Sequence, residues 1–363
     1  MKKIKGLSIR PLTESDREAL LEFYSGFTGE AARWTLAPYP AELVNVWVDN
    51  FHDLLQLGVL HGDRVVGFAQ IEIRRAPIWR GRAYMNIHLA DGYMDPELAA
   101  DMLGRLAAEA EASGVHRLEA SVAADDAFRM GVYKRLGLRV EGRLRDAIWT
   151  GESHRDGVWL GKLVGSDASA PPEPISDDCL QVRAFGGTHP GTVELRDGRR
   201  LEVRAAREGD AEPLFAMFDT MSPEALRWSG VPYTRESVSR MLQPTESKIA
   251  YVAEMDERVV GWTCLTKARH RLRSGSSGLN IYLHQDVHGV GLGTHLMDLL
   301  LGEAKRSGLH RVSLIVAAGN KVAIRLFRRF GFKIEAQLRD AYFGSDGKRH
   351  DLLEMGLIIQ DGF

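Results

Sequence analysis

A run of alternating glycines is the part of the sequence with the clearest chemical use. Gly289, Gly291 and Gly293 lie between an apolar stretch that ends at Leu283 and a second apolar stretch with helical spacing. Glycine lets the backbone approach a ligand closely, and the N–H groups of such a loop and of a helix start attract an anion. We therefore expect a diphosphate to be held by His288, Gly289, Gly291 and Gly293, with Val290, Leu292 and Thr294 also at the binding site. A plain strand-to-helix turn is the alternative.

Two common nucleotide sites do not fit this loop. Its G-x-G-x-G spacing lacks the G-x-G-x-x-G register of dinucleotide-binding folds. His310 and Arg311 stand roughly where the acidic, ribose-binding residue of those folds belongs. A P-loop is excluded as well, because no Gly-Lys-Ser or Gly-Lys-Thr triplet follows the glycines.

Two segments together carry a resemblance to a known family. His288-x-x-Gly291-x-Gly293 resembles the Arg/Gln-x-x-Gly-x-Gly/Ala pyrophosphate loop of the GCN5-related N-acetyltransferases (GNATs), with histidine in the first place. Residues 320–332 resemble the N-x-x-A-x-x-L/Y-Y/F-x-x-x-G-F segment that follows in that family, and residues 335–357 are similar to its ribosomal-protein and small-amine branches. The two motifs have the separation and the strand and helix context that the family shows.

The resemblance implies a mixed α+β fold, in which a central, splayed β-sheet is flanked by helices. It also implies transfer of an acetyl group from acetyl-CoA to an amine, with the pantetheine arm paired to the exposed backbone near Leu283. Asn320 is expected to bond that arm, although it also fits as the N-cap of the helix that follows. Phe327 would line the cofactor site where the family often has tyrosine, and phenylalanine has no proton to give.

The acid and the base of the reaction are sought on one strand. Asn280, Tyr282 and His284 alternate onto one face of it, unless a bulge changes the register. Among these three, only His284 titrates near neutrality, so we expect His284 and Tyr282 to be catalytic. A histidine at a strand end is also often structural. Other candidates are Tyr342 or water as the acid, and Glu254 or His350 as the base.

The acceptor groove is predicted from a segment that follows the first helix of the second half. Arg227, Trp228 and Tyr233 lie where the family tends to build that groove, and an arginine beside aromatic rings could hold a carboxylate or close over an acceptor. Packing is the alternative, because the same residue types recur in the first half. Cysteine, histidine and acidic residues form no metal-ligand motif, so no metal is expected.

An internal repeat sets the positions of these residues. The chain matches itself at a displacement of 194 residues, the distance from Leu7 to Leu201, and the match continues without a gap to Leu144 and Leu338. Such a constant displacement indicates one fold used twice. We predict a degenerate GNAT-like domain at 1–164, a proline-rich linker at 165–191 and an acetyl-CoA-binding domain at 192–363, opened by a hairpin around Asp197-Gly198.

The first copy differs from the second at the glycine loop. Residues 94–99 stand opposite residues 288–293. Pro96 removes an N–H group that a phosphate would use, while Asp95 and Glu97 place negative charge there. Loss of coenzyme binding by this copy is therefore expected.

Two further differences concern the segment after the loop. Asp126 stands opposite Asn320 and replaces an amide by a carboxylate, whereas Tyr133 stands opposite Phe327. We expect the first copy to be a structural partner in which Tyr133 is not catalytic. A packed aromatic in a decayed domain is the other interpretation of Tyr133.

Composition narrows the class of protein. The 363 residues are 44% hydrophobic and 26% charged with a net charge of −2, as in a globular protein without a single-signed face for nucleic acid or membrane. Neither is expected as a partner. Two distant cysteines, Cys179 and Cys264, and the absence of a signal-like apolar start favour the cytoplasm. A monomer could suffice if the two repeats pair as a pseudo-dimer.

The sequence thus predicts an acetyl-CoA-dependent N-acetyltransferase whose acceptor is a small amine, an amino acid or an amino-sugar. Two other functions stay open. One is an acyl-CoA-binding regulatory module without turnover, suggested by the missing tyrosine at Phe327. The other is acetylation of a protein N-terminus or lysine, which would need an open peptide groove.

Overall fold

The structure is a computed structural model that describes residues 6–33, 35, 39–51, 54–165, 182–229, 232–269 and 271–359. The chain divides into two compact units. The first comprises residues 1–144, 150–172 and 339–341, and the second comprises residues 145–149, 173–338 and 342–363. Most of the expected linker, together with Cys179, lies outside the described residues. The domain boundaries given above stay predictions.

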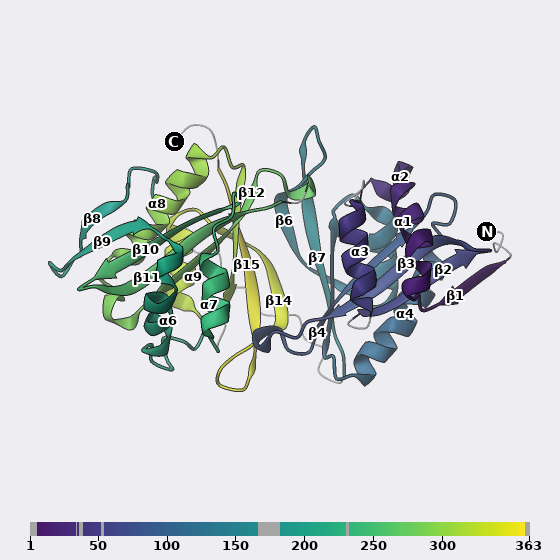
Figure 1. Ribbon diagram of the computed structural model, residues 1–363, viewed down its shortest axis with the longest axis horizontal. Coiled ribbons are helices and arrows are strands. Elements are labelled where there is room, and N and C mark those ends of the chain that lie inside the picture. Colours follow the sequence, from purple (N-terminus) through teal and green to yellow (C-terminus); the bar gives the residue numbers. More distant parts are fainter. Residues whose placement is uncertain are drawn as a thin grey trace. The chain divides into compact units, whose positions relative to one another are not determined.

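The second unit contains the glycine loop. Its elements in chain order are β8 (Gly191–Glu194), β9 (Arg200–Ala205), η4 (Glu208–Asp210), α6 (Ala211–Asp219), α7 (Arg235–Leu242), β10 (Lys248–Met255), β11 (Arg258–Lys267), η5 (Arg271–Arg273), β12 (Ser276–Leu283), η6 (Gln285–Val287), α8 (Leu292–Arg306), β13 (Arg311–Ala317), α9 (Lys321–Arg329), β14 (Lys333–Phe343) and β15 (Arg349–Ile358). The strands of its sheet lie in the order β14-β15-β13-β12-β11-β10-β9-β8 (Figure 1).

The first unit repeats this plan. It contains β1 (Leu7–Arg10), η1 (Glu14–Asp16), α1 (Arg17–Ser25), α2 (Gly29–Ala32), α3 (Ala41–Asp49), β2 (Leu54–His61), β3 (Arg64–Ile73), η3 (Pro77–Trp79), β4 (Arg82–Leu89), α4 (Pro96–Ala112), β5 (Arg117–Ala123), α5 (Ala127–Arg135), β6 (Arg139–Trp149) and β7 (His154–Leu163). Its strands lie in the order β1-β2-β3-β4-β5-β7-β6. The expected fold class, a mixed α/β architecture in two copies, is confirmed.

The local sequence explains the elements that hold the site. The hairpin expected around Asp197-Gly198 is β8–β9, with Val193 opposite Leu201 and Gly198 in the left-handed conformation that suits such a turn. Helix α8 buries the side chains of Leu292, Leu296, Leu299 and Leu300, which recur at helical spacing.

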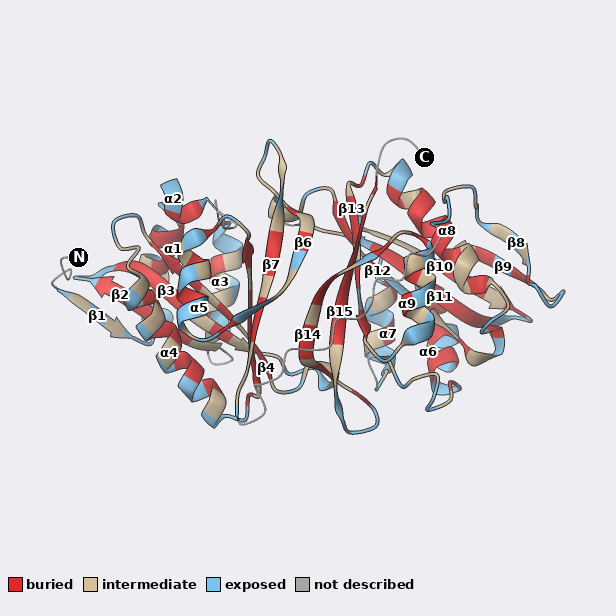
Figure 2. Cartoon of the chain, turned by 180° about the vertical axis from the view of Figure 1, so that it is seen from behind, coloured by how far each residue is buried: buried red, intermediate tan, exposed pale blue. Residues whose placement is uncertain are grey.

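Helices cover both faces of the second sheet. Helices α8 and α9 pack on one face, in a core that includes Leu296, Val312 and Phe327. Helices α6 and α7 pack on the other face, mainly over β10 and β11, in a smaller cluster around Phe218 and Trp262. Figure 2 shows that buried residues dominate β13 and β15, at the centre of this sheet.

The two central strands of the second sheet separate along their length. Strand β12 pairs in parallel with β13 only through Ser276 to Gly278, opposite Arg311 to Ser313. The rest of β12, as far as Leu283, pairs with β11 alone. The first unit has the same feature, because β4 and β5 pair only over residues 82–84 and 117–119. The splayed sheet expected from the resemblance is therefore present.

Several structural details recur at the repeat distance. A bulge follows Val59 in β2 and Ala253 in β10, and an arginine–glutamate pair is buried in each unit. In the first unit that pair is Arg117–Glu141, and in the second it is Arg311–Glu335, with nitrogen and oxygen 2.5 Å apart and both side chains 2% exposed. The repeat therefore extends to buried charge as well as to apolar residues.

Two expectations, on membrane-spanning segments and on cysteines, can be compared with the structure. No helix in the described ranges is both long enough and apolar enough to cross a bilayer. Cys264 is buried and not in a disulfide.

We predict that removing the buried charge at Glu335 destabilises the protein strongly. Glu335→Gln leaves the Arg311 guanidinium buried without its counter-charge, which costs about 3 kcal/mol of unfolding free energy. Urea unfolding of the intact chain measures this loss. Glu212→Gln is the matched control, because Glu212 pairs with Arg235 at 67% exposure of both side chains and should cost at most about 1 kcal/mol. Equal losses in the two variants would show that the buried pair contributes nothing special.

Candidate active site

The glycine loop joins the open end of β12 to α8. After Leu283 the chain makes the short helix η6, and α8 then begins at Leu292 with Gly291 as its N-cap. Gly289 has φ of 75° and Gly291 has φ of 101°, both in the left-handed region that favours glycine. Glycine at these two positions therefore lets the backbone turn directly into the helix.

The loop presents unpaired backbone donors. In the described part of the chain, no hydrogen bond is formed by the N–H groups of Gly289, Val290, Gly291, Leu292 and Gly293. Such donors at a helix start are the partners that phosphate oxygens need. The residues present therefore fit the diphosphate of a coenzyme.

Two predicted contacts have additional structural roles. The His288 ring lies 3.0 Å from the carbonyl oxygen of Leu283, through Nε2, and so fixes the loop to the end of β12. The Asn320 side chain accepts a hydrogen bond from the N–H group of Ala323 and caps α9, which leaves its amide nitrogen available. The expected N-cap role is confirmed, while contacts of His288 and Asn320 with a coenzyme stay predictions.

Phe327 lies deeper than expected. Its side chain is 5% exposed and packs against Phe332 in the core beneath α8 and α9. It therefore contributes packing, and its contact with a coenzyme stays a prediction. Leu292 is likewise buried, whereas Thr294 is half-buried in the first turn of α8.

The face of β12 and β13 that carries Asn280 and Ile315 is exposed. Ile315, in the middle of β13, is 49% exposed, and Asn280 on β12 is exposed as well. Because Gly278 pairs with Ser313, the alternation of side chains places Asn280, Tyr282 and Ile315 on the same face. An exposed isoleucine in a central strand is unusual, and we refer to this exposed stretch beside the gap, as far as its bordering side chains, as the cleft.

Aromatic and charged side chains border this cleft. The Trp228 ring lies so close to Gly319, just after β13, that a Cβ there would be 2.4 Å from it. Tyr342 donates hydrogen bonds to the carbonyl oxygens of Arg227 and Ser229, 3.2 and 3.1 Å away. The structure thus brings together Trp228 and the end of β14, as an acceptor groove would require.

An ion pair and a histidine lie on the same border. The Arg227 guanidinium carbon is 4.8 Å from the centre of the Trp228 ring, and its Nη2 is 3.5 Å from Asp346. His350 Nε2 is 3.0 Å from Asp346 Oδ2, and its ring centre is 5.0 Å from that of Trp228. The hydrogen bond from His350 holds the pKa of Asp346 below its usual value. The border therefore offers one cation, one anion and one imidazole.

Tyr282 lies in an aromatic cluster at the inner end of this face. It stacks on Trp262, and it meets Phe218 and Tyr233 edge-on, with ring centres 5.5 and 6.0 Å away. Tyr233 in turn stacks on Phe218 with ring centres 3.8 Å apart. Burial raises the pKa of Tyr282, so its hydroxyl stays protonated at neutral pH.

His284 has a different environment. It lies just beyond β12 and is 7% exposed. Its Nδ1 accepts from the N–H of Asp286 at 3.3 Å, and its Nε2 is 3.0 Å from the amide nitrogen of Gln285. The ring borders a hollow formed with Met217 and Val260, away from Trp228. Both ring nitrogens are thus occupied by local contacts, and a catalytic role for His284 stays a prediction.

The sequence analysis missed one acidic residue on the cleft face. Glu354 on β15 is 7% exposed and pairs in register with Ile315. The repeat contains a signal for it, because Leu160 stands at the corresponding place in the first copy. Glu254, the acidic residue considered as a base above, forms an ion pair with Arg204, with Oε2 and Nη2 2.7 Å apart.

Comparison with known proteins identifies the family of one domain. Residues 215–332, which include the glycine loop and Asn320, match the Acetyltransferase (GNAT) family. The chain carries a GNAT acetyltransferase domain. Acetyl-CoA is the cosubstrate of this family, and the free N–H groups of residues 289–293 fit its diphosphate.

Named relatives are acetyltransferases of several acceptors. The chain is 27% identical over 160 residues to the Bacillus subtilis protein YwnH, provisionally named a phosphinothricin acetyltransferase, covering 43% of this chain and 98% of that one. It is 37% identical over 59 residues to the L-methionine sulfoximine/L-methionine sulfone acetyltransferase of Pseudomonas aeruginosa, covering 16% and 34%. It is 35% identical over 80 residues to the ribosomal protein bS18-alanine N-acetyltransferase of Escherichia coli, covering 22% and 53%. The chain thus spans about a third and about half of the latter two.

The first copy of the GNAT fold satisfies its own helix start. Helix α4 begins at Pro96, and the Asp95 carboxylate accepts hydrogen bonds from the N–H groups of Glu97 and Leu98, at 2.8 and 3.3 Å. An internal carboxylate thus takes the place that a phosphate has at a GNAT loop. Arg105, which could have compensated this charge, pairs with Asp101.

An arginine also fills the gap between the splayed strands of the first copy. Arg129 is buried, and its Nε donates to the carbonyl oxygen of Ile87, on the part of β4 that no longer pairs with β5. The repeat places Ala323 at the corresponding position in the second copy. The first copy therefore satisfies with a side chain the strand edge to which the pantetheine arm is expected to pair.

Tyr133 is a packed residue of this copy. Its hydroxyl donates to the carbonyl oxygen of Met85 at 3.3 Å, and its ring is 1% exposed. Burial raises its pKa well above the usual tyrosine value. These contacts favour the interpretation of Tyr133 as a structural aromatic, and the expectation that it is not catalytic stays a prediction. Among the described residues of both copies, no cluster of three His, Cys, Asp or Glu side chains could hold a metal ion.

We predict that a carboxylate at Gly291 abolishes acetyl-CoA binding. Gly291→Glu adds negative charge where the diphosphate is expected and strains a left-handed residue. Calorimetry should find at least about a hundredfold loss of affinity, which is the effect of roughly 3 kcal/mol. The matched control is Gly308→Glu, since Gly308 is also left-handed, at φ of 64°, but follows the other end of α8. Unchanged affinity in Gly291→Glu would disprove the assignment of the loop.

We also predict that one acetyl-CoA binds per chain. A carboxylate about 5 Å from a phosphate charge costs roughly 3 kcal/mol at an effective dielectric constant near 20, and Pro96 and Arg129 remove further contacts. Calorimetry on the intact chain should give a stoichiometry near one, and Gly291→Glu should reduce it to zero. A stoichiometry near two, or one site that survives Gly291→Glu, would contradict the prediction.

Proposed function

We propose that the second unit transfers acetyl from acetyl-CoA to the amine of a small molecule, and that this acceptor is an amino acid or a close analogue. The observation that supports the proposal is the open cleft beside the splayed strands, bordered by Arg227 and Asp346. Arg227 can pair with a carboxylate, and Asp346 can pair with an ammonium group. A zwitterion offers both charges at the spacing of one small molecule.

The named relatives support the same acceptor class. Phosphinothricin and methionine sulfoximine, named for two of them, are both amino-acid analogues. Because another relative is named for a ribosomal protein, a protein N-terminus is a second candidate acceptor. The cytoplasmic location and the monomeric state stay predictions.

Two groups on the cleft face are proposed to move protons. Tyr282 would protonate the departing thiolate, because it lies near the unpaired end of β12, on the same face as Asn280 and Ile315. His350, oriented by Asp346, would take the proton from the attacking amine. We prefer His350 to His284 as the base, because the nitrogens of His284 are engaged with Gln285 and Asp286.

Release of free CoA with a panel of acceptors tests the proposed function. The panel pairs L-amino acids with the corresponding decarboxylated amines and with peptides. We expect amino acids to be the best acceptors, and Arg227→Ala to lower kcat/KM for amino acids about tenfold without lowering it for amines. Arg235→Ala is the control, because Arg235 also lies over a ring, that of Phe215, but away from the cleft border. Turnover with peptides alone would favour protein acetylation, and acetyl-CoA binding without any turnover would favour a sensor.

The acid and the base are tested separately. Tyr282→Phe should lower kcat about a hundredfold at unchanged affinity for acetyl-CoA. His350→Ala should lower kcat about a hundredfold at unchanged affinity for acetyl-CoA, whereas His284→Ala should lower thermal stability and leave kcat within about twofold. If His284→Ala loses turnover and His350→Ala retains it, the base is His284. Full turnover in Tyr282→Phe would remove tyrosine from the mechanism.

A further inference from the structure

The β8–β9 hairpin lies against the glycine loop, although it falls outside the part of the chain that matches the GNAT family. The N–H group of Arg196, in the hairpin turn, donates to the carbonyl oxygen of Val290 at 3.0 Å. The guanidinium of Arg199 donates to the carbonyl oxygen of Asp286 at 2.8 Å. Both contacts use acceptors of the loop and leave its N–H donors free, so the hairpin holds the loop without blocking it.

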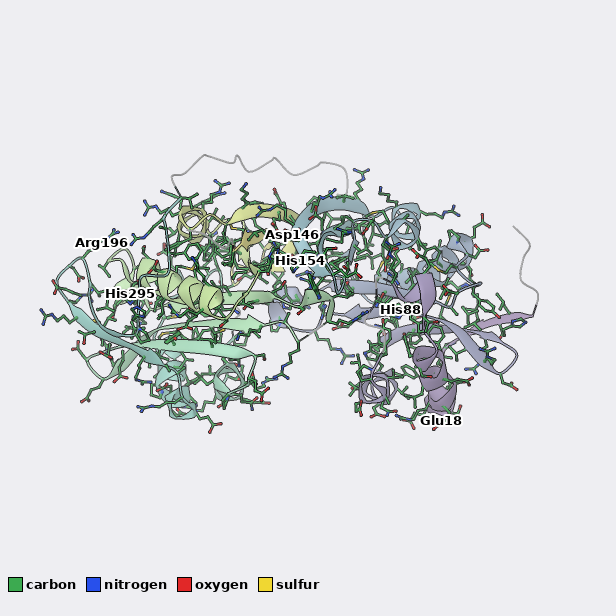
Figure 3. All side chains as sticks on the ribbon, turned by 90° about the horizontal axis from the view of Figure 1, so that it is seen from above. Glu18, His88, Asp146, His154, Arg196 and His295 are labelled. Atoms are coloured by element: carbon green, nitrogen blue, oxygen red, sulfur yellow. The ribbon has the colours of Figure 1, made fainter. Side chains whose placement is uncertain are left out.

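The side chain of Arg196 extends across the same loop. The side chain of Arg196, which is labelled in Figure 3, has its Cγ, Cδ and Nε 3.4 to 3.7 Å from the position that a Cβ on Gly291 would take. This closeness to the N-cap of α8 puts a cation next to the free donors of residues 289–293.

Arg196 also differs from the other arginines of the hairpin. Arg199 pairs with Asp197 at 2.6 Å and Arg200 pairs with Glu194 at 3.4 Å. Arg196 is exposed, and in the described part of the chain its guanidinium has no hydrogen-bond or ion-pair partner. Arg196 is therefore a cation whose backbone is bonded to the glycine loop and whose side chain lacks a counter-charge. An anionic ligand at the loop could supply that counter-charge.

We propose that Arg196 binds the diphosphate of acetyl-CoA, and so adds a side-chain contact from the hairpin to the backbone contacts of the GNAT loop. This inference rests on the proposed function, since it needs acetyl-CoA at the second unit. Arg196 does not reach the reacting atoms in this role. It therefore affects the binding of the coenzyme and not the chemical step.

Calorimetric titration of the full chain with acetyl-CoA tests the proposal. Arg196→Ala should raise Kd about fivefold to tenfold, and Arg196→Lys should recover part of the loss. Arg200→Ala, on the same hairpin and 74% exposed, is the matched control and should change Kd less than about twofold. In steady-state kinetics, Arg196→Ala should raise KM for acetyl-CoA and leave kcat unchanged. Thermal melting of each variant shows whether the fold is kept.

A second ligand identifies the phosphate that Arg196 contacts. The proposal requires the same fivefold to tenfold loss with 3′-dephospho-CoA, which retains the diphosphate. A loss seen only with ligands that carry the 3′-phosphate would overturn it, as would equal affinity of Arg196→Ala and the unmodified protein. If the unmodified protein does not bind acetyl-CoA, the proposed function itself fails. If it binds and Arg196→Ala binds equally well, only the role of Arg196 is lost.

Discussion

The short pairing between β12 and β13 is the constraint on which the rest of the second unit depends. Three residues of each strand pair, and beyond Gly278 the strands diverge. A central strand that loses a neighbour has backbone groups that need other partners, since unpaired buried N–H and C=O groups are costly. A ligand with amide groups, such as a pantetheine arm, can supply them. The same divergence exposes Ile315 and Asn280 on the other face, so under the proposed function one gap would admit the coenzyme and the acceptor from different sides.

The first unit has the same gap and fills it from within. Arg129 binds the carbonyl oxygen of Ile87 and pairs with Asp126, while Asp95 caps the helix that would have received phosphate. The acceptor side is filled too, because His88, at the position of Tyr282, lies buried between the hydroxyls of Tyr24 and Tyr39, 2.9 and 3.2 Å away (Figure 3). A splayed sheet can thus be retained as a stable fold when side chains take over the contacts of the ligands.

The sequence predicts those features that depend on local patterns. The displacement of 194 residues from Leu7 to Leu201, the glycine loop and the helices follow from residue types within short windows, and the structure has them. The use of Arg129 on α5 could not be predicted, although its position opposite Ala323 is visible, because its acceptor lies on β4, far away in the sequence. His350 was a candidate base, but neither its pairing with Asp346 nor the buried Glu354 was predicted, since hairpin geometry and sheet register decide where these residues lie. Strand alternation predicted that His284 shares a face with Tyr282, but it did not predict that Gln285 and Asp286 engage the His284 ring.

This contrast follows from the kinds of groups that build the two sides of the site. The coenzyme side is made largely of backbone N–H groups, which a short glycine motif fixes. The acceptor side is made of side chains from separate segments, in which Arg227 and Asp346 currently neutralise each other at 3.5 Å. Because this pair is exposed, its separation costs at most about 1 kcal/mol. A zwitterionic acceptor would replace it with two new ion pairs and leave the net charge of the cleft unchanged, whereas a simple amine would leave Arg227 without its partner. Under the proposed function, charge balance at this border therefore favours an amino acid over an amine, even where both would fit the same space.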